Sequence, residues 1–98
     1  MAYKFDYQQT IQQAKLLDEL AQDMQNNSIK KLNEVCENIE AAWSGDAGKA
    51  YLKYMRGVQG DLQKKAKYIR EVADFLRSAA KKMQAAEAAA KMKAQNIR

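Results

Sequence analysis

The sequence predicts an all-α fold, in which two long helices form an antiparallel hairpin around one corner near the middle of the chain. Apolar residues recur at three- and four-residue steps on both sides of residues 43–46, and proline is absent from all 98 residues. The only tryptophan, Trp43, stands near Gly45 where the helical pattern is interrupted. We expect one domain over residues 1–98, with helix one at about 7–42, the turn at 43–46, helix two at about 47–85, and a helical or frayed tail at 86–98.

The first helix is expected to begin after Asp6, which stands three residues before Gln9 in the spacing of a capping box. Asn26, Asn27 and Ser28 compete for backbone hydrogen bonds and could cap a separate helix, so a three-helix bundle is the alternative. The absence of glycine and proline in this stretch favours one continuous helix. Its apolar stripe then keeps one phase through Ile11, Ala14, Leu17, Ala21, Met24, Ser28, Leu32, Val35, Ile39 and Ala42.

The second helix follows a corner at which Ser44 or Asp46 can accept hydrogen bonds from free backbone amides. Gly57 and Gly60 lie inside this helix and each costs about 1 kcal/mol relative to alanine. Close approach of another helix, or a local bend, would explain that cost. The stripe runs through Leu52, Met55, Val58, Leu62, Ala66, Ile69, Ala73, Leu76, Ala80 and Met83.

A lone hairpin of this size buries little apolar surface, so we expect self-association or a partner. Cys36, the only cysteine, lies close to the stripe and is interpreted as a small core residue; a disulfide between two copies is the alternative. The residues predicted to form the core and dimer face are Leu17, Met24, Leu32, Val35, Ile39, Met55, Val58, Leu62, Ile69 and Leu76.

Charge and composition restrict the function. Residues 1–46 carry 4 basic and 8 acidic side chains, a net charge of −4, whereas residues 47–98 carry 13 basic and 4 acidic ones, a net charge of +9. The basic half could bind nucleic acid, but its aromatic residues do not interleave with the basic ones as base stacking requires. We therefore favour the interpretation that the basic residues form a solvated face that complements the acidic first helix. Histidine is absent, and no cluster has metal-ligand spacing, so we expect no enzyme, no metal and no cofactor.

The corner resembles a known family. Trp43, Gly45, Ala47, Ala50 and Tyr51 stand midway in a chain of about 100 residues between two amphipathic helices, as in the WXG (Trp-x-Gly) hundred-residue family of ESAT-like proteins. The resemblance covers nearly the whole chain. It implies an elongated four-helix bundle made by dimerisation, and export by the membrane-embedded ATPase of type VII (ESX) secretion in actinobacteria and firmicutes.

The physics of the corner agrees with that resemblance. Trp43 is expected to lay its indole across the end of the bundle, and its replacement by alanine to cost about 3 to 5 kcal/mol. Gly45 keeps the corner tight, Ala47 and Ala50 allow close packing, and Tyr51 is expected to bury its ring. In the family this corner is also implicated in engaging the secretion machinery.

The export signal departs from the family pattern. The family places a tyrosine, followed four residues later by Asp or Glu, just beyond helix two; here Met83 and Glu87 occupy those positions. Either this pair is a degenerate signal, or a partner carries the proper one, or Met83 is simply the last core residue. No apolar signal segment precedes the first helix, so the chain is expected to be made in the cytoplasm and secreted without a cleavable signal peptide.

These observations favour a small secreted substrate of type VII secretion that pairs with itself or with a paralogue. The first alternative is a targeting partner for the helical N-terminal domain of a larger secreted toxin. The second is a basic nucleic-acid-binding protein, and an enzyme is the least favoured.

Overall fold

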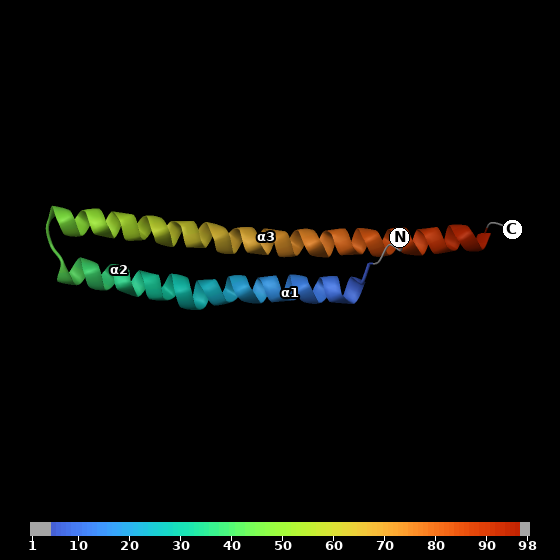
Figure 1. Cartoon of the computed structure of the whole chain (residues 1–98), viewed down its shortest axis with the longest axis horizontal. Helices are drawn as coiled ribbons and strands as arrows, with labels where there is room; N and C mark the ends of the chain where they lie inside the picture. Colours follow the sequence, from blue (N-terminus) through green and yellow to red (C-terminus); the bar gives the residue numbers. More distant parts are fainter. Residues whose placement is uncertain (1–4, 97–98) are drawn as a thin grey trace.

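The computed structural model describes residues 5–96, and these residues form a helical hairpin (Figure 1). One arm consists of α1 (Tyr7–Asp23), the π-helical segment η1 (Met24–Ile29) and α2 (Lys30–Ala42); we call this arm helix one. The other arm is a single helix, α3 (Asp46–Asn96). The molecule measures 82 × 21 × 18 Å, so it is a rod. The parts of the expected tail and N-terminus at residues 1–4 and 97–98 lie outside the described residues.

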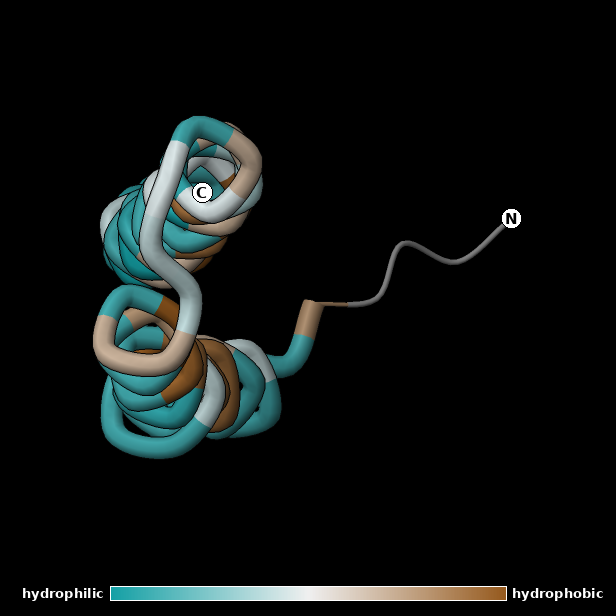
Figure 2. Tube along the Cα trace, turned by 90° about the vertical axis from the view of Figure 1, so that its left-hand side faces the viewer, coloured by the Kyte–Doolittle hydropathy of each residue, from teal (hydrophilic) through white to brown (hydrophobic). Residues whose placement is uncertain are grey.

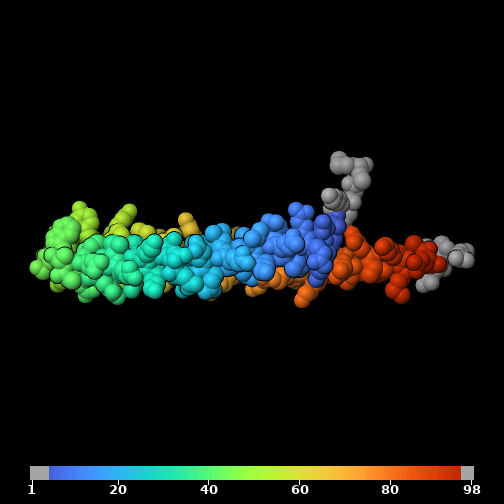
Figure 3. All heavy atoms as spheres, turned by 90° about the horizontal axis from the view of Figure 1, so that it is seen from below, coloured from blue at the N-terminus to red at the C-terminus, as the bar shows by residue number. Residues whose placement is uncertain are grey.

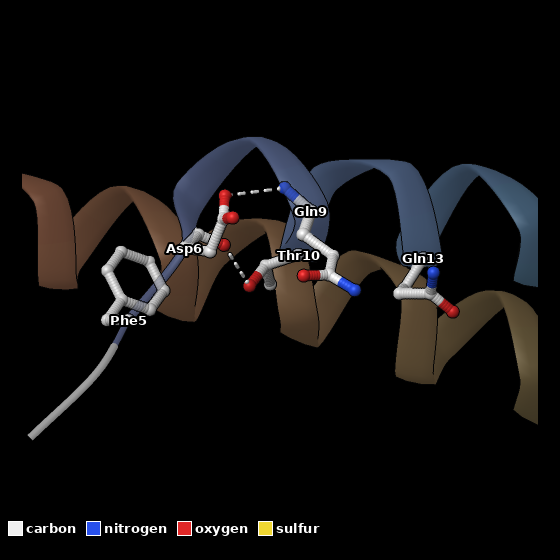
Figure 4. Close-up of a pocket in the computed structure, with 5 residues that line it drawn as sticks. All are labelled: Phe5, Asp6, Gln9, Thr10 and Gln13. Atoms are coloured by element: carbon white, nitrogen blue, oxygen red, sulfur yellow. Dashed lines mark hydrogen bonds between the residues drawn. The ribbon is translucent and has the colours of Figure 1, made fainter.

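The start of α1 is capped as its sequence predicts. The Asp6 carboxylate accepts a hydrogen bond from the Gln9 backbone amide at 3.0 Å, and the Thr10 hydroxyl donates to the Asp6 carbonyl at 2.8 Å (Figure 4). These bonds satisfy groups that a helix terminus leaves without intrahelical partners. The pocket whose lining residues are drawn in Figure 4 therefore lies at the capped start of α1.

The two arms meet along a narrow line of mostly small side chains, which we call the seam. On helix one the buried residues are Ala14, Ala21, Ile29 and Cys36, and on α3 they are Ala66, Ala73 and Ala80. Their spacing is seven residues on α3 and on each half of helix one, which is the repeat that keeps one line of contact between two supercoiled helices. Small residues there let the backbones approach closely. The expectation that Cys36 is a small core residue is confirmed, because it is fully buried.

The stripe predicted for helix one is wrong in its second half. The chain continues without a break, but η1 shifts the phase by one residue, so Ile29 and Cys36 are buried while Ser28 and Val35 are exposed. Asn26, Asn27 and Ser28 all lie in η1. These residues therefore mark a change of helix type and do not begin a separate third helix.

Polar side chains join the arms along one flank of the seam. Arg77 of α3 pairs with Asp18 of α1, and Arg56 donates a hydrogen bond to Asn33 of α2 at 2.7 Å. Asp18 and Asn33 each stand four residues after a seam residue, and so does Arg77. We call this side the polar flank. It uses the expected attraction between an acidic first helix and a basic second one.

The second arm is longer than the first. At about 1.5 Å per residue, α3 spans about 76 Å and helix one about 54 Å. The tail expected to be helical or frayed is helical to Asn96, and residues 84–95 are exposed. Figure 3 shows this end of α3, in orange and red, extending past the start of α1.

Candidate functional site: the corner and the open face

The corner is made by residues 43–45, one residue shorter than the predicted turn. Trp43 ends α2 with an extended backbone (φ −132°, ψ 99°), and its amide donates to the Ile39 carbonyl at 2.9 Å. Gly45 then takes a φ of +101°, a conformation that side-chain-bearing residues rarely adopt. The Lys49 amide donates to the Gly45 carbonyl at 3.1 Å and closes the first turn of α3. Gly45, predicted to keep the turn tight, thus lies at the turn position whose positive φ favours glycine.

A second glycine at the corner was missed by the sequence reasoning. Gly48 is buried, and a Cβ built on it would lie 2.3 Å from the carbonyl oxygen of Trp43. Only glycine therefore lets the first turn of α3 lie against the end of α2. A glycine one turn inside the expected helix, three residues after Gly45, was the available signal.

The aromatic pair at the corner is on the surface. Trp43 stacks on Tyr51 with a centroid distance of 5.0 Å and an interplanar angle of 23°. Trp43 is 48% exposed and Tyr51 55% exposed, so the expectation that both rings are buried is wrong for the single chain. Ala47 and Ala50 are exposed as well. At the corner the end of α2 meets the start of α3, and two helix ends are too narrow to cover an indole.

A comparison with family models identifies the architecture. The model described as WXG100, proteins of 100 residues with WXG, matches residues 2–88. The chain belongs to the WXG100 family. Trp43 and Gly45 supply the tryptophan and glycine of the family's name at the corner of the hairpin. Searches of curated proteins and of solved structures found no match.

Members of the WXG100 family are small helical substrates of type VII secretion, and the matched region ends before the last turns of α3. None of the helices described between residues 5 and 96 is long and apolar enough to cross a membrane. Over the same residues, no three Cys, Asp or Glu side chains are grouped as a metal site would require.

The second feature of the WXG100 hairpin is an apolar surface on the side opposite the polar flank, which we call the open face. Its inner rows stand three and six residues after the seam positions of each arm, and antiparallel packing places these rows of both arms on the same side. Figure 2, which looks along the rod, shows apolar segments gathered on one side of the lower arm. The open face consists of Leu17, Leu20, Met24, Leu32, Val35 and Ile39 from helix one and Tyr51, Met55, Val58, Leu62, Ile69, Val72 and Leu76 from α3.

Exposure on the open face increases with distance from the seam. Met24, Leu62 and Ile69 are half-buried and pack against the seam cluster. One row further out, Leu20 is 49% and Val35 42% exposed. Beyond these rows lie Leu16 of α1 and Tyr54, Tyr68 and Phe75 of α3, of which Phe75 is 69% exposed.

All ten residues predicted for the core and dimer face lie in the two inner rows of the open face. Within the chain they flank the seam, while the seam itself is made mainly of alanines. Gly57 and Gly60 do not contact the other arm through their Cα positions, since nothing lies within 4 Å of a Cβ built on either. None of the helices between residues 5 and 96 therefore explains these two glycines.

The predicted export-signal residues lie where α3 begins to extend past helix one. Met83 stands three residues after Ala80 of the seam and is half-buried, and Glu87 is exposed one turn later. The pair is thus on one side of α3, near the start of α1. The corner, with Trp43 and Tyr51, is at the opposite end of the rod.

Proposed function

We propose that this WXG100 protein is a noncatalytic substrate of a type VII secretion system, exported as a folded dimer in which two copies cover each other's open faces. The observation that carries the proposal is the family match over residues 2–88 on a hairpin whose large apolar side chains lie mainly on one side. A large apolar surface concentrated on one side is typical of a protein interface.

The seam alone leaves many of the large apolar side chains of the hairpin in contact with solvent. Its side chains are mainly alanines, which bury little area, whereas the larger side chains of the chain lie on the open face. A second hairpin laid against that face would bury the inner rows of both copies. The result is a four-helix bundle with small seams inside each copy and larger side chains between the copies.

Charge supports a second copy as the partner. Residues 1–46, which include helix one, carry a net charge of −4, and residues 47–98 carry +9. A second copy turned so that its helix one lies next to α3 of the first brings opposite charges together at both edges of the interface. A paralogue with the same charge distribution would fit equally, and the mass of the purified protein distinguishes the two, because only a chain that pairs with itself gives twice its own mass.

In this proposal the two ends of the rod contact the membrane-embedded ATPase. The half-exposed pair of Trp43 and Tyr51 offers a rigid aromatic contact at the corner, and Met83 with Glu87 offers an apolar side chain and a carboxylate one turn apart. Because methionine replaces the tyrosine of the family signal, a targeting partner of a larger secreted toxin is the second candidate. In that case the toxin's helical domain covers the open face and supplies the signal.

A secretion assay tests the proposal. The tagged protein is produced in its own host and in a strain without the type VII ATPase, and its amounts in culture medium and cell lysate are compared, with a cytosolic enzyme as a lysis control. We expect the protein in the medium only when the ATPase is present. Equal amounts in both media would contradict the proposal, and export only in the presence of a neighbouring toxin gene would favour the second candidate.

A further inference from the structure

The π-helical segment η1 is the one place where the described helix one departs from regular α geometry, and it lies near the middle of that arm. A π turn closes hydrogen bonds to the fifth residue along, so it takes up one more residue than an α turn. Such insertions disturb packing unless the residues on both sides need the shift. The seam of α3 has no matching shift, since Ala66, Ala73 and Ala80 keep seven-residue steps.

The buried residues of helix one show what the shift achieves. Seven-residue steps from Ala14 and Ala21 would next reach Ser28 and Val35 if the helix were regular. The structure instead buries Ile29 to 5% exposure and Cys36 completely. A regular helix would place the Ser28 hydroxyl in this apolar seam and would move Ile29 and Cys36 out of it.

The polar flank shows the same shift independently. Asp18 stands four residues after Ala14 and pairs with Arg77, while Asn33 stands four residues after Ile29 and accepts a hydrogen bond from Arg56 at 2.7 Å. If helix one kept all its residues but were a regular α-helix, Leu32 would take the position of Asn33. An apolar side chain would then face the Arg56 guanidinium, and the open face would lose a leucine.

We propose that η1 is a register-setting element: it absorbs one surplus residue so that both halves of helix one share a single seam, a single polar flank and a single open face. In this proposal the effect depends on how many residues η1 contains and not on which residue is the surplus one. Removing one residue from η1 converts it to α-helix and leaves Ala14, Ala21, Ile29 and Cys36 at uniform seven-residue steps. This inference concerns the fold of the single chain and does not depend on the proposed secretion.

The test compares two single-residue deletions in the full chain. Deletion of Asn27 removes the surplus residue, whereas deletion of Lys67, an exposed residue of the uninterrupted α3, moves Ala73 and Ala80 out of the seam. Asn27→Ala is the control for loss of the hydrogen bond that Asn27 donates to Asp23. Thermal unfolding is followed by circular dichroism at one protein concentration. The rate at which a thiol reagent modifies Cys36 under native conditions reports whether this side chain stays in the seam.

We expect the deletion of Asn27 to leave the Tm unchanged or raised, and the deletion of Lys67 to lower it by roughly 10 °C or more. Cys36 should stay as protected after the Asn27 deletion as in the unaltered chain and in Asn27→Ala. A Tm loss after the Asn27 deletion similar to that of the Lys67 deletion, or a rise of about tenfold or more in the rate of Cys36 modification, would overturn the proposal.

Discussion

The four glycines of this chain serve different purposes, although all four lie at or after the corner. Gly45 adopts a positive φ, and Gly48 lies against the Trp43 carbonyl, where no Cβ fits. Gly57 and Gly60 have open space around them inside a helix. In the single chain, the first two are therefore required by the geometry and the last two weaken α3.

Substitution by alanine should separate these roles. We expect Gly48→Ala and Gly45→Ala to lower the free energy of unfolding by about 1 to 3 kcal/mol each. The new Cβ would clash with the backbone at Gly48, and alanine would be strained by the positive φ at Gly45. Gly57→Ala and Gly60→Ala should raise it by about 0.5 to 1 kcal/mol each. Urea unfolding of the four variants at equal concentration measures this. A loss of stability in Gly57→Ala or Gly60→Ala would show that another helix packs closely there after all.

At the residue scale, the sequence could predict part of the corner. The interruption of the helical pattern beside Trp43 and Gly45 located the turn, because glycine is the usual residue at a positive φ. The exposure of Trp43 could not be predicted, since it depends on how many helices share the end of the rod. The need for Gly48 depends on the exact path of the turn, which is set by the extended backbone of Trp43.

At the scale of helices, the close packing of the arms depends on small side chains. The stripes predicted from the sequence contained the alanines of the seam, but the residues chosen from them as the core were the larger Leu, Ile, Val and Met side chains. Two helices that approach closely instead select alanines for the centre and displace the larger side chains to one flank. The seven-residue spacing of Ala66, Ala73 and Ala80 was the available signal. The phase shift at η1 could not be predicted, because it appears only when both arms are matched.

The seam should not tolerate a large side chain. Ala73 is fully buried in it, so Ala73→Leu should push the arms apart and lower the free energy of unfolding by about 1 to 3 kcal/mol. Ala88→Leu, the same change on the exposed end of α3, should alter it by less than about 0.5 kcal/mol. Chemical denaturation of both variants checks the contrast. Equal effects would mean that the buried alanines do not form the seam.

At the scale of the whole molecule, the hairpin has two unlike sides. Hydrogen bonds and an ion pair cover one flank, while the other leaves side chains such as Leu20, Val35 and Phe75 in solvent. The sequence predicted both the hairpin and the need for a partner, because a two-helix chain cannot bury all its apolar residues. It could not identify the partner, which depends on a surface outside this chain.

A single charge on the open face should separate pairing from folding. Val35 is 42% exposed in the hairpin, so Val35→Glu should leave the helix content unchanged but prevent a second copy from binding, because an unpaired carboxylate would be buried. Lys30→Gln changes the charge by the same amount at an exposed position directly after Ile29, on the side of the polar flank, and should leave pairing intact. Circular dichroism measures the helix content and light scattering the mass of each variant.

The mass of the unaltered protein in solution tests the central claim most directly. Size-exclusion chromatography with light scattering at micromolar concentration should give twice the 11.1 kDa of one chain. It should return to the single-chain mass in Val35→Glu. A well-folded, monodisperse protein with the mass of one chain, in the absence and in the presence of its neighbouring gene products, would contradict the claim that the open face is an interface.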